Sequence, residues 1–183
     1  MDKVLIAIRE IITGLVSDSA SPLYYNASTA QGGIKRVFKG DPAQIPTNEF
    51  PCIIVRPVSS SWVGRHTRYD KKEHRVEVII VANMNTYKDT DPDDAGVVLS
   101  LQTMMDMMEK TDNVQSTSAK TIVGVLSANP TLPYTIAGPL TKYAAVDIKP
   151  ESVDYVFNSS RGFPTFEVIA LFSVTSQGDR AAS

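Results

Sequence analysis

Apolar residues recur at every second position along two stretches of this chain, and this periodicity constrains the fold more than any other feature of the sequence. The stretches are 74–84 and 165–174. A period of two places one apolar face on a β-strand. A third run, Cys52–Val58, is apolar through its centre, which predicts a strand that is covered on both faces. Pro51 and Pro57 bound that run, and they predict that its pairing is interrupted.

Two other segments show the three-and-four spacing of an amphipathic α-helix. The first spans 4–18. The second follows a helix start at Asp91, where a proline at the next position and two further aspartates favour a helix N-terminus. A short apolar run at 121–126 predicts one more strand. The stretch that follows it, 130–141, is broken by three prolines and a glycine.

The order of these elements predicts the fold class. Residues 153–157 and 165–174 should form an antiparallel hairpin, with Arg161 at the tip of its turn. A polar stretch, 59–73, joins two strong strands and is long for a hairpin connection, so we expect a long hairpin arm there. Strands interrupted by two helices predict an α+β fold, with a mostly antiparallel sheet and both amphipathic helices packed on one face.

The composition fits one ordinary globular domain. The chain has 183 residues, of which 43% are hydrophobic and 21% charged, and we expect 1–183 to form a single domain. Within it, 19–33 should be a loop and 177–183 a flexible tail. The formal net charge is −2, which argues against a general grip on nucleic acid. A single cysteine and the lack of an apolar run near ~20 residues predict a soluble, intracellular protein without a membrane contact.

Residues that could carry chemistry are scattered along the sequence. His66 and His74 have no further metal ligand at suitable spacing. Cys52 lies inside an apolar run, which predicts a buried, unreactive thiol. The acidic group at 91–94 is better explained by helix capping than by a cation loop, because the glycine and later glutamate of such a loop are missing. We therefore expect no catalytic residue, no metal, no cofactor and no enzymatic activity.

Two stretches carry opposite charge. Residues 59–75 hold five basic and two acidic side chains, whereas 85–94 hold four acidic and one basic. Such stretches are usually solvated faces, but in a head-to-tail assembly one of them can dock on the other. Two aromatic residues within the basic stretch are interpreted first as local packing and second as partner anchors. The candidate contact residues are Trp62, Arg65, Arg68, Tyr69, Lys71, Lys72, Asp89, Asp91, Asp93, Asp94 and Arg161.

The succession of these elements resembles one family of viral proteins. An amphipathic N-terminal helix leads to "GDP…IP…FPCIIVRPV", and a long excursion then returns as "EHRVEVIIVANM". A helix with a Pro-Asp-Asp start follows, and then a hairpin that ends in "FEVIALFSV". This order resembles the tail terminator, or tail-completion, proteins of tailed bacteriophages over 4–174, and more loosely the neck proteins between head and tail. The stretches 19–33 and 130–141 are longer than the compact pattern of the family, so both assignments stay open.

The resemblance implies a structural function. Such a subunit would assemble into a homo-hexameric ring that caps the tail tube, stops its polymerisation and joins the tail to a head-tail connector or neck protein. DNA would pass through the channel without specific binding, which suits a chain of mild negative charge. The protein would be assembled in the cytoplasm of the host bacterium and reside in the virion, in the tail or neck.

A different function class stays open from the residues alone. Trp62 and Tyr69, together with the basic stretch around them, could bind nucleic acid by stacking and phosphate contacts. A steep salt dependence of binding would identify that class.

Overall fold

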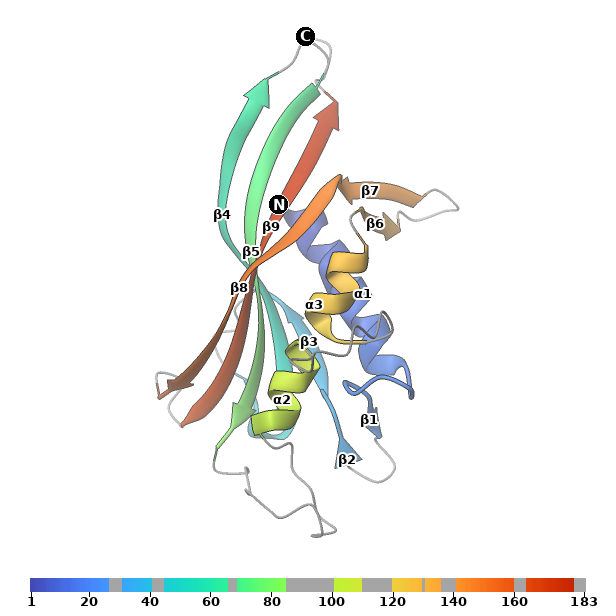
Figure 1. The fold of residues 1–183 in the computed structure, drawn as a ribbon. Coiled ribbons are helices and arrows are strands. Elements are labelled where there is room, and N and C mark those ends of the chain that lie inside the picture. Colours follow the sequence, from blue (N-terminus) through green and yellow to red (C-terminus); the bar gives the residue numbers. More distant parts are fainter. Residues whose placement is uncertain are drawn as a thin grey trace.

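The fold is built on a twisted, mostly antiparallel sheet (Figure 1). The computed structural model describes the chain except for residues 27–30, 41–44, 66–68, 85–100, 110–119, 130, 136–140, 160–163 and 180–183. Within these bounds the main sheet has five strands in the order β3-β4-β5-β9-β8. β3 runs parallel to β4, and every other neighbouring pair is antiparallel. The strands are β3 (Arg36–Lys39), β4 (Cys52–Arg65), β5 (Tyr69–Asn83), β8 (Asp147–Asn158) and β9 (Thr165–Asp179).

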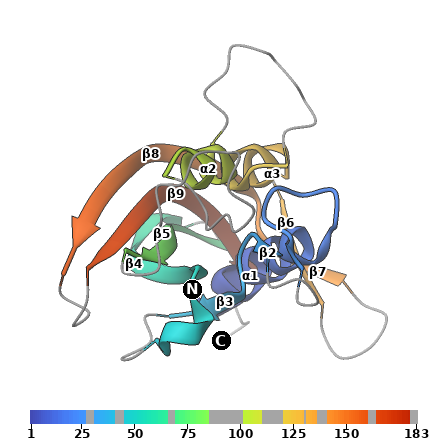
Figure 2. The ribbon, with the colours of Figure 1, turned by 90° about the horizontal axis from the view of Figure 1, so that it is seen from below.

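Helices and two small hairpins complete the described part of the chain, which confirms the α+β class. Figure 2 shows α2 and α3 beside β8 and β9, and α1 close to β3. The helical elements are α1 (Asp2–Ser17), the 3-10 turn η1 (Thr47–Glu49), α2 (Leu101–Met108) and α3 (Ile122–Ala128). The small hairpins are β1 (Tyr25–Asn26) with β2 (Gln31–Gly32), and β6 (Leu132–Thr135) with β7 (Thr141–Ala145).

The larger core lies between the helices and one face of the sheet. The predicted first helix is confirmed, since its apolar stripe from Val4 to Leu15 is buried in this core. From the sheet, alternate residues of β5, Val76 to Ala82, and of β9, Phe166 to Val174, point into the same core. The period of two in the sequence therefore marks the face that the helices cover.

A smaller core covers the opposite face of the sheet at one end. Ile45 and Phe50, from the segment before β4, pack there on Cys52, Ile54 and Ile79. The first four residues of β4 have no exposed surface, which confirms coverage on both faces for this part of the predicted run. Beyond them β4 becomes exposed from Pro57 onward.

Residues 121–126 form a helix and not the expected strand. The Thr121 side chain accepts a hydrogen bond from the Gly124 amide at 3.0 Å and so caps α3. Ile122 and Leu126, four positions apart, are the buried residues of this helix, as the helical repeat requires. A short apolar run does not distinguish strand from helix by periodicity, and here the threonine cap selected the helix.

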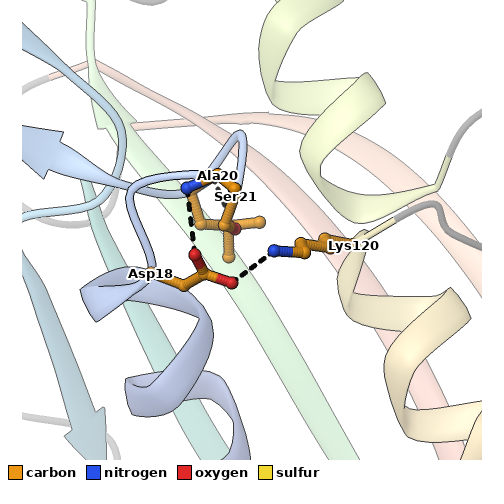
Figure 3. Close-up of polar contacts among 5 residues, drawn as sticks. Asp18, Ala20, Ser21 and Lys120 are labelled. Atoms are coloured by element: carbon orange, nitrogen blue, oxygen red, sulfur yellow. Dashed lines mark hydrogen bonds and ion pairs between the residues drawn. The ribbon is translucent and has the colours of Figure 1, made fainter.

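The Asp18 carboxylate links the C-terminal end of α1 to the segment just before α3 (Figure 3). Asp18, which follows α1, accepts 2.9 Å and 2.5 Å hydrogen bonds from the Ala20 amide and the Lys120 ammonium. The hydrogen bond from Lys120, followed by that from Ala20, lowers the pKa of Asp18 below its usual value. This contact joins residues that are far apart in the sequence.

The stretch 19–33, which was expected to be a loop, contains two short strands. In 19–33 the short β1–β2 hairpin closes, and Gly33 lies so near the chain that a Cβ atom there would meet the Leu23 carbonyl oxygen at 2.0 Å. Only glycine permits that approach. Within 130–141, β6 pairs with β7 and includes Pro133. Their bulged two-stranded sheet tolerates proline because it has no central strand.

The pairing of β4 is more continuous than its prolines predicted. β4 pairs with β5 from Cys52 to Arg65, with register shifts at Pro57/Ser59 and Trp62/Gly64. A bulge absorbs the proline without ending the ladder. Most of 59–73 is therefore strand that is paired within the sheet, and not a separate connection.

Three further expectations concern residues that the structure does not describe or describes in part. The helix start at Asp91 and the turn at Arg161 lie outside the described residues. The tail expected to be flexible was 177–183. Its first three residues, 177–179, belong to β9 and pair with β5, where Asp179 is opposite Tyr69. Residues 180–183 lie outside the described part of the chain.

Candidate functional site

The candidate site is the end of the sheet where β4, β5 and β9 continue together past the helices (Figure 1). We call residues 59–65, 69–75 and 173–179 the distal sheet. β5 lies in its centre and pairs with β4 on one side and with β9 on the other. β8 accompanies β9 only up to the pair Asp147–Thr175. Beyond that pair, no described strand pairs with β9 on its outer side.

One face of the distal sheet carries an exposed aromatic and a cation. Trp62 and Lys72 are opposed across β4 and β5, and the Lys72 ammonium lies 3.9 Å from the centre of the Trp62 ring. The indole is 52% exposed. Val63 follows it in the bulge and is also half-exposed. A cation over an indole face is a favourable pair, worth about 0.5–1 kcal/mol when exposed to solvent.

Two partly buried hydrogen bonds tie the three strands together on the same face. His74 bonds the Ser60 hydroxyl through Nδ1 at 2.8 Å and the Ser176 hydroxyl through Nε2 at 2.7 Å. Burial lowers the pKa of His74 to about 4, and the positive N-terminal amine and Lys72 act in the same direction. The imidazole is therefore neutral at pH 7, and one serine donates to it while the other accepts. His74 is buried, and it lies on the same face of β5 as Val76 and Val78, which line the larger core.

The opposite face of the distal sheet is polar. Glu73 accepts a 2.6 Å hydrogen bond from the Ser173 hydroxyl, and Arg75 pairs with Glu151 at 3.3 Å. A shallow recess there is lined by Ser59, Ser61, Glu73 and Arg75. Both charged groups of this recess therefore have partners, and these contacts link β5 to β9 and to β8.

The distal sheet brings together only part of the predicted contact set. Trp62, Lys71 and Lys72 lie on it, and the backbone of Arg65 and Tyr69 forms its tip. The remaining predicted residues lie outside the described part of the chain: Arg68, Asp89, Asp91, Asp93, Asp94 and Arg161. The expected docking of a positive stretch on a negative one therefore stays a prediction.

A second exposed apolar group lies on β8 and was missed in the sequence. Tyr155, Val156 and Phe157 are 40%, 38% and 64% exposed. The Tyr155 hydroxyl donates to Glu109 at 3.3 Å, and the Phe157 ring lies 5.0 Å from that of Phe166. Burial, with the Glu109 charge as the next cause, raises the pKa of Tyr155. Three consecutive large apolar residues in a weakly alternating strand are the signal that could have identified this group.

The candidates for chemistry were also located. Cys52 is buried and unbonded to another cysteine, as expected. Within the described residues, no group of three His, Cys, Asp or Glu side chains is placed to hold a metal ion. None of the helices in that part of the chain has the length and apolar character needed to cross a membrane.

Comparison with known proteins adds no assignment. Neither the scan against protein-family models nor the search of curated proteins finds a match to this chain.

Proposed function

We propose that this chain is a structural subunit of a bacteriophage tail, which assembles into a ring that caps the tail tube, stops its growth and joins it to the head connector. A neck protein in the same joint is the related alternative. The proposal combines the order of the sequence elements with the geometry of the distal sheet.

The observation that carries the proposal is the exposed Trp62–Lys72 pair on strands that project past the helices. A half-exposed tryptophan on a projecting strand has little value for the stability of one subunit. Tryptophan is one of the residues that most often act as anchors in protein interfaces. The two hydrogen bonds of His74 hold the three strands in register, so the anchor is presented on a preorganised surface.

Assembly in the presence of tail tubes tests the proposal. Purified protein is added to tubes isolated from a phage that encodes the chain, and the mixture is imaged by negative-stain microscopy. Native mass spectrometry of the protein alone gives its oligomeric state. We expect six-fold rings, either free or on one end of each tube. A strict monomer that never joins a tube would contradict the proposal.

A variant pair tests the role of the distal sheet. Trp62→Ala combined with Lys72→Glu should abolish joining, because it removes the anchor and reverses the charge beside it. Val63→Ala is the control, since Val63 is also 52% exposed and follows Trp62 directly. Equal joining by both variants would exclude the distal sheet as the contact surface.

Nucleic-acid binding is the second candidate, and the same pair of residues favours it. An exposed indole next to a lysine suits stacking with a phosphate contact. However, the Lys72 ammonium already occupies one face of the Trp62 ring. A gel shift with single-stranded and duplex DNA decides the matter, since true phosphate contacts weaken steeply as salt is raised.

A further inference from the structure

The open edges of the main sheet are protected to different degrees. β4 extends beyond its four pairs with β3, but two bulges, at Val58 and Val63, interrupt that stretch. The first half of β8 carries Pro150 and a bulge. Bulges and prolines are the usual means of preventing an edge strand from pairing with another chain.

The second half of β8 lacks such protection. Ser152–Asn158 pairs with β9 in uninterrupted register and contains no proline, lysine or arginine. β8 is the last strand on its side of the sheet as described. The exposed group Tyr155, Val156 and Phe157 lies on this half. An open, mostly apolar edge that no bulge or proline interrupts is a template for strand addition.

β3 is the edge strand on the other side of the sheet. When the paired residues are followed across the sheet, β3 lies level with the second half of β8. Arg36 of β3 pairs with Cys52, and Cys52 pairs with Val81. Val81 pairs with Glu167, and Glu167 pairs with Val156. Val156 is therefore level with Arg36 across the whole sheet. By the same route, Lys39 at the end of β3 is level with Val153.

The two edges also run in opposite directions. β3 is parallel to β4, and three antiparallel steps then lead from β4 through β5 and β9 to β8. A rotation about an axis that runs roughly along the strands would bring β8 of one copy beside β3 of the next. The two would be antiparallel without a shift along the strands, which is the more stable arrangement for a strand pair.

We infer that, in the ring of the proposed function, on which this inference rests, β3 of one copy adds as an antiparallel strand to Ser152–Asn158 of β8 in the next copy. The sheets of neighbouring subunits would then be continuous. In this pairing Val37 of one copy faces Tyr155 of the next on the helix side. On the other side, Arg36 of one copy lies diagonal to Asp154 of the next.

Charge selects this pairing over the pairing of two β3 edges. Residues 35–39 contain three cations and no acid, whereas the only charged side chain in 152–158 is that of Asp154. Two β3 edges would place cations opposite one another, which is unfavourable. The Arg36 side chain is 58% exposed and is held at 3.1 Å by Glu49, so its guanidinium is positioned before the partner arrives.

A lysine placed on the open edge tests the inference. Val156→Lys adds the charge that protects natural edge strands, and it sets that charge against Arg36 of the neighbour. Val58→Lys is the matched control, because Val58 is also an exposed valine but lies in the β4 bulge. We expect Val156→Lys to lose the ring in native mass spectrometry while its circular dichroism is unchanged, and Val58→Lys to keep the ring.

A cross-link keeps the test decisive if the lysine variant fails to fold. Arg36→Cys and Val156→Cys are combined in one chain, and each alone serves as a control. Mild oxidation should join the double variant into a ladder of oligomers, while the single variants stay unlinked; Cys52 is buried and can be left in place.

The outcomes separate the two proposals. Two results would overturn the inference and leave the proposed function intact. In the first, rings form on tube ends but the oxidised double-cysteine variant gives no ladder of oligomers. In the second, the Val156→Lys variant still forms rings. Efficient dimer formation by Tyr155→Cys alone would show that two β8 edges pair symmetrically, which also overturns it. A wild-type chain that stays monomeric and ignores tubes would overturn both.

Discussion

The Lys72 ammonium lies 3.9 Å from the centre of the Trp62 ring, and the two residues are opposed on neighbouring antiparallel strands. Because Trp62 is the only tryptophan of the chain, its fluorescence reports on this pair alone. In the free subunit we expect emission and acrylamide quenching typical of a half-exposed indole. On joining a tube or ring, the emission should shift to shorter wavelength and the quenching should fall. Unchanged quenching in the assembled state would show that the distal sheet is not the contact.

The stability of the chain should depend on pH through His74. Its pKa is lowered to about 4 from an unfolded value near 6.5, so the unfolded state binds the proton first. The stabilising contribution is complete above pH 6.5, and it is lost as the pH falls from 6.5 towards 4. The loss is at most about 1.4 kcal/mol per pH unit.

Urea unfolding between pH 7 and 4 measures this dependence. His74→Gln should flatten the curve in that window, because glutamine can bond both serines without titrating. His66→Gln removes the other histidine of the chain and serves as the control. If wild type and His74→Gln keep the same slope, His74 is not the group responsible.

The N-terminal cap of α3 should contribute measurably to stability. Thr121→Ala removes the acceptor of the 3.0 Å bond from the Gly124 amide, and we expect a loss of about 1 kcal/mol in the free energy of unfolding. Thr121→Ser retains the hydroxyl and should lose less. Comparable losses in the two variants would mean that the threonine methyl group, and not the cap, matters at this position.

The thiol of Cys52 should be unreactive in the folded protein. Cys52 has no exposed surface and packs in the smaller core with Phe50 and Ile54. A thiol reagent such as dithionitrobenzoate should therefore label the chain only after unfolding in urea, with one thiol per chain. Rapid labelling under native conditions would show that the smaller core opens or that the thiol is accessible for chemistry.

The sequence predicts a strand or helix correctly where its apolar residues keep one spacing over many residues. The strands at 74–84 and 165–174 and the helix at 4–18 were predicted because each repeats its pattern over several turns or pleats. The strand predicted at 121–126 was wrong, because that run is too short for a period to be resolved.

The candidate site was predicted only in part. Trp62 and Lys72 stood out as an aromatic and a cation in a polar stretch, yet nothing local indicated that they oppose one another. The β8 group was missed because exposure, and not composition, distinguishes Phe157 from the buried Phe172.

The sequence by itself determined which face of each long strand and of α1 is apolar, since the alternation of side chains is a local property of the chain. Only the tertiary structure decided that β5 lies between β4 and β9, that His74 is buried against Ser176, and that β3 and β8 form the two edges at one height. Strand order depends on contacts between residues distant in the sequence, and those are selected by shared burial and backbone pairing that no local pattern records.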